Sequence, residues 1–197
     1  MKKYDEAKKL PFQELKGISQ KTIENHYGKL YQGYVKKWQE IQEKLNSVDL
    51  SSANATFSEL RELKLEEGFV ADAVLLHEAY FDILGGDGVP KGEILERISQ
   101  DFGSFENWQK EFKALGLAAR GWVVLAFDFN DGKLHNYIAD FHNQGGIWGT
   151  SPTLVLDVYE HAYFIDYGAD RKSYLEAFFH NLNWEFINKK FGKTVKR

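Results

Sequence analysis

The first half of the chain carries two long stretches in which apolar residues recur every three or four positions. In the first stretch these residues are Ile23, Tyr27, Leu30, Tyr31, Tyr34, Val35, Trp38, Ile41 and Leu45. In the second they are Val70, Ala73, Val74, Phe81 and Leu84, and His77 lies on the same stripe. This spacing is typical of an amphipathic helix, and Ser19 is well placed to cap the first one. We therefore predict two long helices, at 19–45 and 57–84, separated by a turn-rich break at 46–54.

The pattern changes after a Gly- and Pro-containing linker at 85–90, which ends the second helix. We expect helices at 91–101, 104–117, 159–166 and 172–188, and strands at 122–127, 134–139 and 153–156. The first two strands flank Asn130-Asp-Gly132, a good hairpin turn. The sequence thus predicts an α+β fold, with an N-terminal long helical hairpin at 1–86. An α+β domain with a small, three-stranded antiparallel sheet follows at 87–197.

Composition narrows the possible chemistry. The chain has no cysteine, so a bound metal would need His, Asp or Glu ligands. A net charge of −4 gives no overall basic field, and we expect no nucleic-acid partner. No run approaches the ~18 apolar residues of a membrane span, and the N-terminus lacks the apolar core of a secretory signal. We expect a cytoplasmic protein with no membrane partner.

Four residues could form a metal site. Asp157 and His161 are four apart at a predicted strand-to-helix junction, and both can face one ion. His26 shares a helix face with Leu30 and Tyr34, and His77 lies on the core-facing stripe of the second helix. A single inward histidine is more often a hydrogen-bonded structural residue. Three histidines with one aspartate form a set that suits iron or manganese and leaves room for a solvent ligand.

The string at 157–163, Asp-Val-Tyr-Glu-His-Ala-Tyr, resembles the signature of the iron/manganese superoxide dismutase family. Further segments that resemble the family, in the family's order, are 18–19, 22–29, 34–35, His77 with Tyr80, 102–105, 121–122, 143–144 and 183–184. The resemblance covers about residues 10–191. It implies that His26, His77, Asp157 and His161 bind one Mn or Fe ion per subunit, between the two halves of the chain. The implied reaction is a ping-pong disproportionation of superoxide to dioxygen and hydrogen peroxide.

The same resemblance implies two catalytic residues. Tyr34 would be a gate on the substrate path that joins a proton relay. Gln144 would hydrogen-bond the metal-bound solvent. Iron members of the family usually carry this glutamine at the position of Ala73 instead, so the pattern weakly favours manganese. Without the family context, Tyr34 is a core aromatic residue and Gln144 an exposed loop amide.

The resemblance also implies a homodimer and a substrate funnel. Glu160 would cross the interface to the partner subunit's His161, and Tyr163 would lie at the same interface. Lys29 and Arg171 would be the basic residues near the funnel that attract the anionic substrate. The plainer interpretation of Glu160 and Lys29 is that they are solvated surface charges.

Several residues around the implied site depart from the family, although Trp122 matches it. Leu30 and Tyr31 stand where histidines are frequent, and Phe81 and Tyr159 stand where tryptophans usually line the metal pocket. A leucine can neither donate a hydrogen bond nor carry a proton. An alternative is therefore a non-catalytic or attenuated metal-binding homodimer of the same fold. An oxygen-activating iron enzyme ranks last, because such enzymes need several open coordination positions.

The remaining histidines are His135, His142 and His180, and we assign them no function from the sequence. His142 lies two residues from Gln144 and could approach the site.

Overall fold

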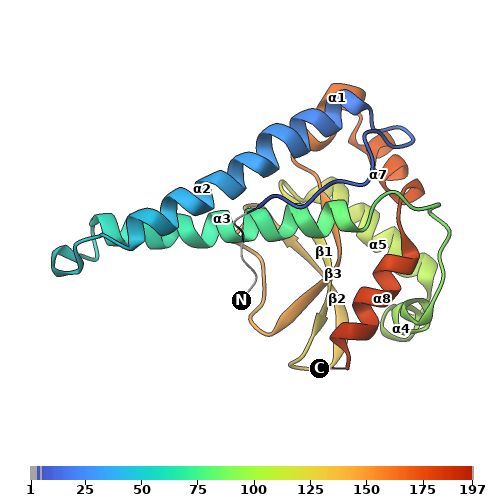
Figure 1. Ribbon diagram of the computed structural model, residues 1–197. Coiled ribbons are helices and arrows are strands. Elements are labelled where there is room, and N and C mark those ends of the chain that lie inside the picture. Colours follow the sequence, from blue (N-terminus) through green and yellow to red (C-terminus); the bar gives the residue numbers. More distant parts are fainter. Residues whose placement is uncertain (1–3, 5, 197) are drawn as a thin grey trace.

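A computed structural model describes residue 4 and residues 6–196 (Figure 1). Residues 1–3, 5 and 197 lie outside the described residues. The helices are α1 Gln20–Ile23, η1 Glu24–Tyr31, α2 Gln32–Leu45, η2 Leu50–Ser52, α3 Glu59–Asp82, α4 Glu93–Phe102, α5 Phe105–Ala118, η3 Glu160–Ala162, α6 Phe164–Tyr167, α7 Arg171–His180 and α8 Trp184–Thr194. The strands are β1 Trp122–Asp128, β2 Lys133–Ala139 and β3 Thr150–Asp157.

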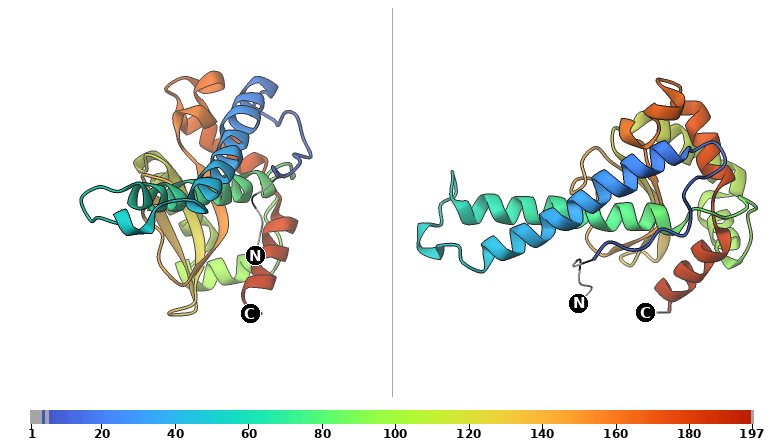
Figure 2. Two further views of the ribbon diagram at one scale, coloured as in Figure 1. Left: turned by 60° about the vertical axis from the view of Figure 1, so that its left-hand side comes forward. Right: turned by 45° about the horizontal axis from the view of Figure 1, so that its top comes forward.

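The N-terminal half is a long helical hairpin, as the sequence predicts. One continuous helical run, α1–η1–α2, packs against α3, and the far ends of both project from the body of the molecule (Figures 1 and 2). Ser19 caps the first run by accepting a hydrogen bond from the Thr22 amide, and Ser58 caps α3 through the Arg61 amide. No helix among the described residues is long and apolar enough to cross a membrane.

The middle of the first helical run is π-helical, a feature that the apolar spacing did not predict. In a π-helix the hydrogen bonds join residues five apart, so the turn is wider than in an α-helix. His26 and Tyr31, five residues apart, are the buried members of η1, whereas Leu30 is only half-buried. The prediction that His26 shares its inward face with Leu30 is therefore wrong, because the wide turn puts Tyr31 there.

The second half contains the expected three-stranded antiparallel sheet. β1 is buried along its whole length because it lies in the centre of the order β2-β1-β3. Trp122, which opens β1, pairs with Asp157, the last residue of β3. α3 contacts β3, so one helix of the hairpin runs along the sheet and joins the two halves (Figure 1).

The C-terminal helical segments are shorter than predicted. The expected helix at 172–188 is broken at 181–183, where the chain pairs with the linker: Gly86 N–H donates to the Asn181 carbonyl at 3.0 Å. The approach is so close that a Cβ on Gly86 would come within 2.3 Å of the Leu182 carbonyl oxygen. The expected helix at 159–166 is instead a 3₁₀ turn, η3, followed by the short α6. Both interruptions come from tertiary contacts or a turn that local periodicity does not encode.

Candidate metal site

The four predicted ligands meet at the junction of the two halves. His26 comes from η1, His77 from α3, Asp157 from the end of β3 and His161 from η3, and their ligand atoms all lie within 4.8 Å of one another. Asp157 Oδ2 is 3.1 Å from Nε2 of His26, 3.1 Å from Nε2 of His161 and 3.7 Å from Nε2 of His77. Ligands bound to one ion at ~2.1 Å are about 3.0 Å apart at right angles and about 3.6 Å apart at 120°, so these spacings fit one shared metal.

The tautomer of His77 supports a metal rather than a hydrogen-bonded cluster. His77 Nδ1 is 2.7 Å from the Ala73 carbonyl oxygen, an acceptor only, so Nδ1 carries the proton and Nε2 carries a lone pair. That Nε2 is buried, and it has no hydrogen-bond partner among the described residues. Its lone pair faces the Asp157 carboxylate, which is also an acceptor. A cation between the two atoms satisfies both.

Asp157 is the charged member of the site. Burial alone would raise its pKa, but the neighbouring His161 and the hydrogen bonds from His161 and His26 lower it below the usual carboxyl value. The pKa of His161 is raised, because Asp157 outweighs the opposing effect of burial. Burial lowers the pKa of His26 and lowers that of His77 further, so both are neutral near pH 7. Neutral imidazoles and an ionised carboxylate are the forms that bind a metal.

Hydrogen bonds fix the position of Asp157 from two directions. The Tyr159 amide donates to Asp157 Oδ1 at 2.9 Å, which leaves Oδ2 for the histidines. The Tyr174 hydroxyl donates to the Asp157 backbone carbonyl at 2.7 Å, and the Tyr80 hydroxyl lies 3.2 Å from that of Tyr174. Tyr80 also lies against His26, with ring centres 5.1 Å apart. Buried tyrosines thus connect the strand ligand to a helix ligand.

His142 lies beside the site, with its ring centre 5.8 Å from that of His77, although we assigned it no function from the sequence. The Trp122 indole N–H donates to His142 Nδ1 at 3.0 Å, so the proton of this imidazole is on Nε2. His142 Nε2 is 3.0 Å from the Tyr34 hydroxyl oxygen and therefore donates to it. Burial lowers the pKa of His142 to about 4, which keeps it neutral. The only indication in the sequence was that His142 follows β2 and lies two residues before Gln144.

Gln144, predicted to hydrogen-bond the metal-bound solvent, lies in the same loop as His142. It is exposed, and its backbone amide bonds to the Phe141 carbonyl at 3.4 Å. The chain turns sharply after it, because Gly145 has φ +91° and packs against the Ile138 carbonyl with no room for a Cβ. The Tyr34 hydroxyl is hydrogen-bonded to His142.

Tyr34 is half-buried at the edge of the site, with its ring 5.5 Å from that of His77. Burial, together with the negative charge of Asp157, raises its pKa, so the hydroxyl stays protonated at neutral pH. Because its oxygen accepts from His142, its own proton can point to a substrate. This geometry fits the predicted gate.

Three of the residues that depart from the family pattern contact the ligands directly. The Phe81 ring is 4.9 Å from His26, and the Tyr159 ring stacks on His161 at 5.3 Å. Ala73 is fully buried, and its carbonyl holds His77. Leu30 is half-buried on the π-helical turn.

The predicted interface and funnel residues differ in exposure. Glu160 and Lys29 are exposed, whereas Tyr163 is 4 % exposed. Arg171 is tied to the fold by hydrogen bonds to the Tyr163 hydroxyl and to the carbonyls of Gly116 and Ala119. Elsewhere, His135 pairs with Asp131 on the β1–β2 hairpin at 2.8 Å, away from the site.

Comparison with known protein families agrees with this geometry. Residues 90–190 match the model of the C-terminal domain of iron/manganese superoxide dismutases. The chain belongs to the iron/manganese superoxide dismutase family. It is 44 % identical over 189 residues to the iron superoxide dismutase of Aquifex aeolicus, an alignment that covers 93 % of this chain and 89 % of the relative.

Members of the superoxide dismutase family with either metal resemble this chain along most of its length. The iron superoxide dismutase of Cupriavidus metallidurans is 40 % identical over 186 residues, covering 93 % of each chain. The manganese superoxide dismutase 1 of Halobacterium salinarum is 35 % identical over 189 residues, covering 91 % of this chain and 90 % of the relative. The family assignment therefore includes a mononuclear iron or manganese centre and leaves the choice between them open.

Proposed function

We propose that the chain disproportionates superoxide to dioxygen and hydrogen peroxide at one iron or manganese ion held by His26, His77, Asp157 and His161. The observation that carries the proposal is the convergence of three imidazole nitrogens on the buried Asp157 Oδ2, one of them an unpartnered lone pair on His77. A bound iron or manganese ion supplies the one-electron exchange that the reaction needs. Family membership and the names of the relatives support the same reaction.

The ligand residues set the charge of the site. Three neutral imidazoles and one carboxylate compensate only one charge of a divalent or trivalent ion, which leaves a net positive site that attracts a small anion. Asp157 can stay ionised in this buried position because His161 and His26 face its Oδ2 atom. The deep burial of His26 and His77 excludes water from the helical side of the site.

Tyr34, His142 and Trp122 control the approach to the site and the supply of protons. The Trp122 indole fixes the tautomer of His142, and His142 in turn holds the Tyr34 oxygen. The Tyr34 proton is then free to be donated to an anion that approaches the ligands. Peroxide formation requires protons, and this hydroxyl is well placed to deliver one. We propose that His142 orients the Tyr34 hydroxyl, a role that the sequence analysis assigned to no residue.

Metal preference is the finer part of the proposal. The weak sequence preference for manganese rested on Gln144 together with Ala73, and the Gln144 side chain is exposed. The chain closely resembles relatives named iron superoxide dismutase and relatives named manganese superoxide dismutase. We therefore propose that the site accepts either ion, with the manganese preference remaining a prediction.

We also propose a homodimer built around Glu160. Glu160 is exposed although it is next to a ligand, and Phe164 and Ile165 nearby are 53 % and 43 % exposed. Exposed apolar side chains beside a carboxylate fit a self-complementary interface in which Glu160 reaches the partner subunit's His161. Sedimentation equilibrium should give twice the chain mass, and Glu160→Ala should raise the dimer dissociation constant.

The function is tested with protein reconstituted separately with manganese and with iron. Metal content is measured first, and the decay of superoxide is then followed by stopped flow. We expect about one ion per chain, and for at least one metal a decay far faster than with the same concentration of free ion. His77→Ala should lose both properties. A fully loaded protein that is no faster than the free ion would refute the enzymatic proposal.

A further inference from the structure

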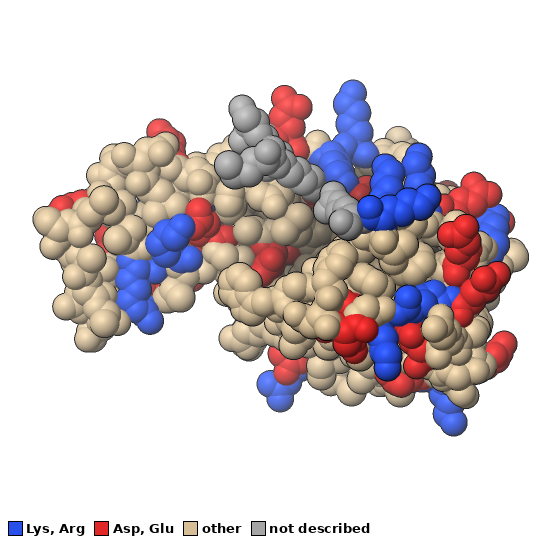
Figure 3. Space-filling model, turned by 90° about the horizontal axis from the view of Figure 1, so that it is seen from below, with Lys and Arg blue, Asp and Glu red and all other residues tan. Residues whose placement is uncertain are grey.

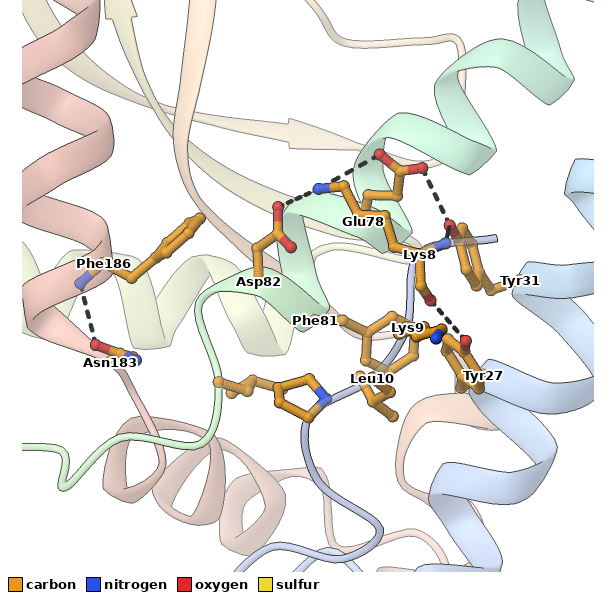
Figure 4. A pocket seen from close by; sticks show the side chains of 12 residues that line it. Lys8, Lys9, Leu10, Tyr27, Tyr31, Glu78, Phe81, Asp82, Asn183 and Phe186 are labelled. Atoms are coloured by element: carbon orange, nitrogen blue, oxygen red, sulfur yellow. Dashed lines mark hydrogen bonds and ion pairs between the residues drawn. The ribbon is translucent and has the colours of Figure 1, made fainter. Parts of the chain in front are cut away.

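The chain segment at 8–11, here called the N-terminal strap, lies across η1 and α3 (Figure 4). Lys8 anchors it through main chain and side chain. Its amide donates to the Tyr31 hydroxyl at 2.9 Å, and its carbonyl accepts from the Tyr27 hydroxyl at 2.6 Å. Its ammonium pairs with Asp82 at 2.5 Å and with Glu78 at 3.6 Å. The strap is thus bonded to both helices that carry histidine ligands.

Tyr31 is the centre of this network. Its hydroxyl accepts from the Lys8 amide and donates to Glu78 Oε1 at 3.0 Å, so one oxygen links the strap, η1 and α3. Tyr31 is 1 % exposed and Glu78 is 4 % exposed. A buried hydroxyl bonded to a carboxylate is costly to disrupt, because each group would be left without a partner in the protein interior. The π-helical turn makes the network possible, since it turns Tyr31 rather than Leu30 inward.

Tyr31 and Phe81 form a wall between the ligand histidines and a surface cavity. The Tyr31 ring stacks on His77 with centres 6.4 Å apart, and the Phe81 ring is 4.9 Å from His26. The same two side chains line a cavity of about 280 Å³ bordered by the strap (Figure 4). Such a cavity is large enough for several water molecules. Tyr31 and Phe81 therefore lie between these histidines and the cavity.

The wall and the gate lie against different parts of the site. Two groups of rings contact His77. The first consists of Tyr34, His142 and Trp122. The second consists of Tyr31 and Phe81. Among the described residues, the ring contacts between the two groups run through the ligand histidines. A small anion can therefore be admitted past Tyr34 while Tyr31 keeps the other side closed.

We propose that Tyr31, clamped between the Lys8 amide and the Glu78 carboxylate, is a positioning residue that closes the metal site on the strap side and retains the bound ion. The clamp holds the π-helical turn, and hence His26, against His77 on α3. Loss of the clamp lets the turn and the strap separate from α3, which exposes the two helix ligands to water and to chelators from the cavity. The proposal rests on the proposed metal site, but it concerns retention of the ion rather than turnover.

The test measures release of manganese from the loaded, full-length protein into excess EDTA, with metal remaining on the protein determined by atomic emission. Tyr31→Phe keeps the ring and removes both hydrogen bonds, and should release metal at least ~10-fold faster, the effect expected for an outer partner of a ligand. Glu78→Gln keeps an oxygen acceptor for Tyr31 and should stay within about twofold of the wild type. Lys9→Met is the matched control in the strap, because Lys9 is not part of the network of Lys8, Tyr31 and Glu78. Its release of metal should match that of the wild type.

A second destabilised variant distinguishes loss of the clamp from a general loss of stability as the cause of faster metal release. Ile98, fully buried in α4, lies in the second half of the chain, and Ile98→Ala should lower stability without altering the strap. Release from Ile98→Ala is compared with release from Tyr31→Phe at temperatures where both have the same fraction unfolded. Faster release from Tyr31→Phe supports the clamp. Equal release from the two variants, or a wild-type rate for Tyr31→Phe, overturns it. A wild-type protein that binds no stoichiometric metal would instead refute the proposed function itself.

Discussion

The two ligands from the helices and the two from the sheet half contribute different properties to the site. His26 and His77 are both 0 % exposed, and burial lowers their pKa values, so they enter the site neutral. Asp157 is equally buried but stays ionised, and the side chain of His161 is 24 % exposed with a raised pKa. The helical half supplies shielded neutral donors, and the sheet half supplies the charge.

This difference explains why the site needs both halves. The Asp157 carboxylate in a dry interior would be unstable without cationic or hydrogen-bonding partners, and the lone pair of His77 would be unsatisfied without a cation. Neither half alone provides a complete set of ligands. Metal binding should therefore stabilise the packing of the hairpin on the sheet, and the predictions below test each side of that arrangement.

The largest effect is expected from removing the charge on the sheet side. Asp157→Asn keeps the shape of the side chain but leaves only three neutral imidazoles as ligands, so the protein should no longer bind stoichiometric metal. Added metal raises the melting temperature of the wild type, and it should not raise that of the variant. Atomic emission and calorimetry with and without manganese measure both. Asp131→Asn, at the other His–Asp pair, should change neither. An Asp157→Asn protein that retains one ion per chain would contradict the ligand assignment.

A smaller effect is expected beside the gate. His142→Ala removes the donor to the Tyr34 oxygen and leaves the four ligands in place, so metal should be retained while kcat/KM falls by about 10- to 100-fold. Gln144→Ala should stay within about twofold of the wild type, because that side chain is exposed. Stopped-flow assays of the metal-loaded variants decide between the two residues. The reverse ranking would show that Gln144, and not His142, serves the site.

The metal-free protein should lose stability as the pH falls. His26, His77 and His142 have folded-state pKa values below the ~6.5 of an exposed imidazole, so below that pH the unfolded chain binds more protons. Their contribution is complete above pH ~6.5 and is lost as the pH falls towards the lowered values, about 4 for His142. His161 has the opposite sign: its contribution is complete below ~6.5 and is lost as the pH rises through its raised pKa.

Urea unfolding of the metal-free protein between pH 7.5 and 4.5 measures this balance. Three histidines with lowered pKa values outnumber one with a raised value, so the free energy of unfolding should decrease across the range. His142→Gln cannot be protonated and should give a shallower decrease. A pH-independent free energy of unfolding would contradict the neutral, buried state of these imidazoles.

The smallest effect is expected for the funnel charges. Lys29→Gln removes an exposed charge and should lower kcat/KM by about twofold at low ionic strength, with little change at high salt. Arg171→Gln should instead mainly lower the melting temperature, because this guanidinium bonds to Tyr163, Gly116 and Ala119. Salt-dependent kinetics and thermal denaturation distinguish the two roles. Equal salt dependence in both variants would show that Arg171 also guides the substrate.

The sequence by itself determined most of the elements and, through the family resemblance, the identity of the candidate ligands. Apolar spacing marks the hairpin and the three strands, because burial of one helix face or of a central strand leaves a regular pattern in the residues. The motif around Asp157 and His161, with His26 and His77 on inward-facing stripes, was enough to indicate the four residues of the site. Those features depend on local geometry, which the spacing of residues records directly.

Tertiary structure alone decided which side chains surround the ligands. The π-helical turn put Tyr31 inward in place of Leu30, and the tight turn at Gly145 left Gln144 in solvent while His142 met Trp122 and Tyr34. Pairing between the linker and residues 181–183 split one expected helix into two. These outcomes depend on contacts between segments far apart in the chain, and a local pattern of apolar and polar residues carries no information about how closely such segments approach.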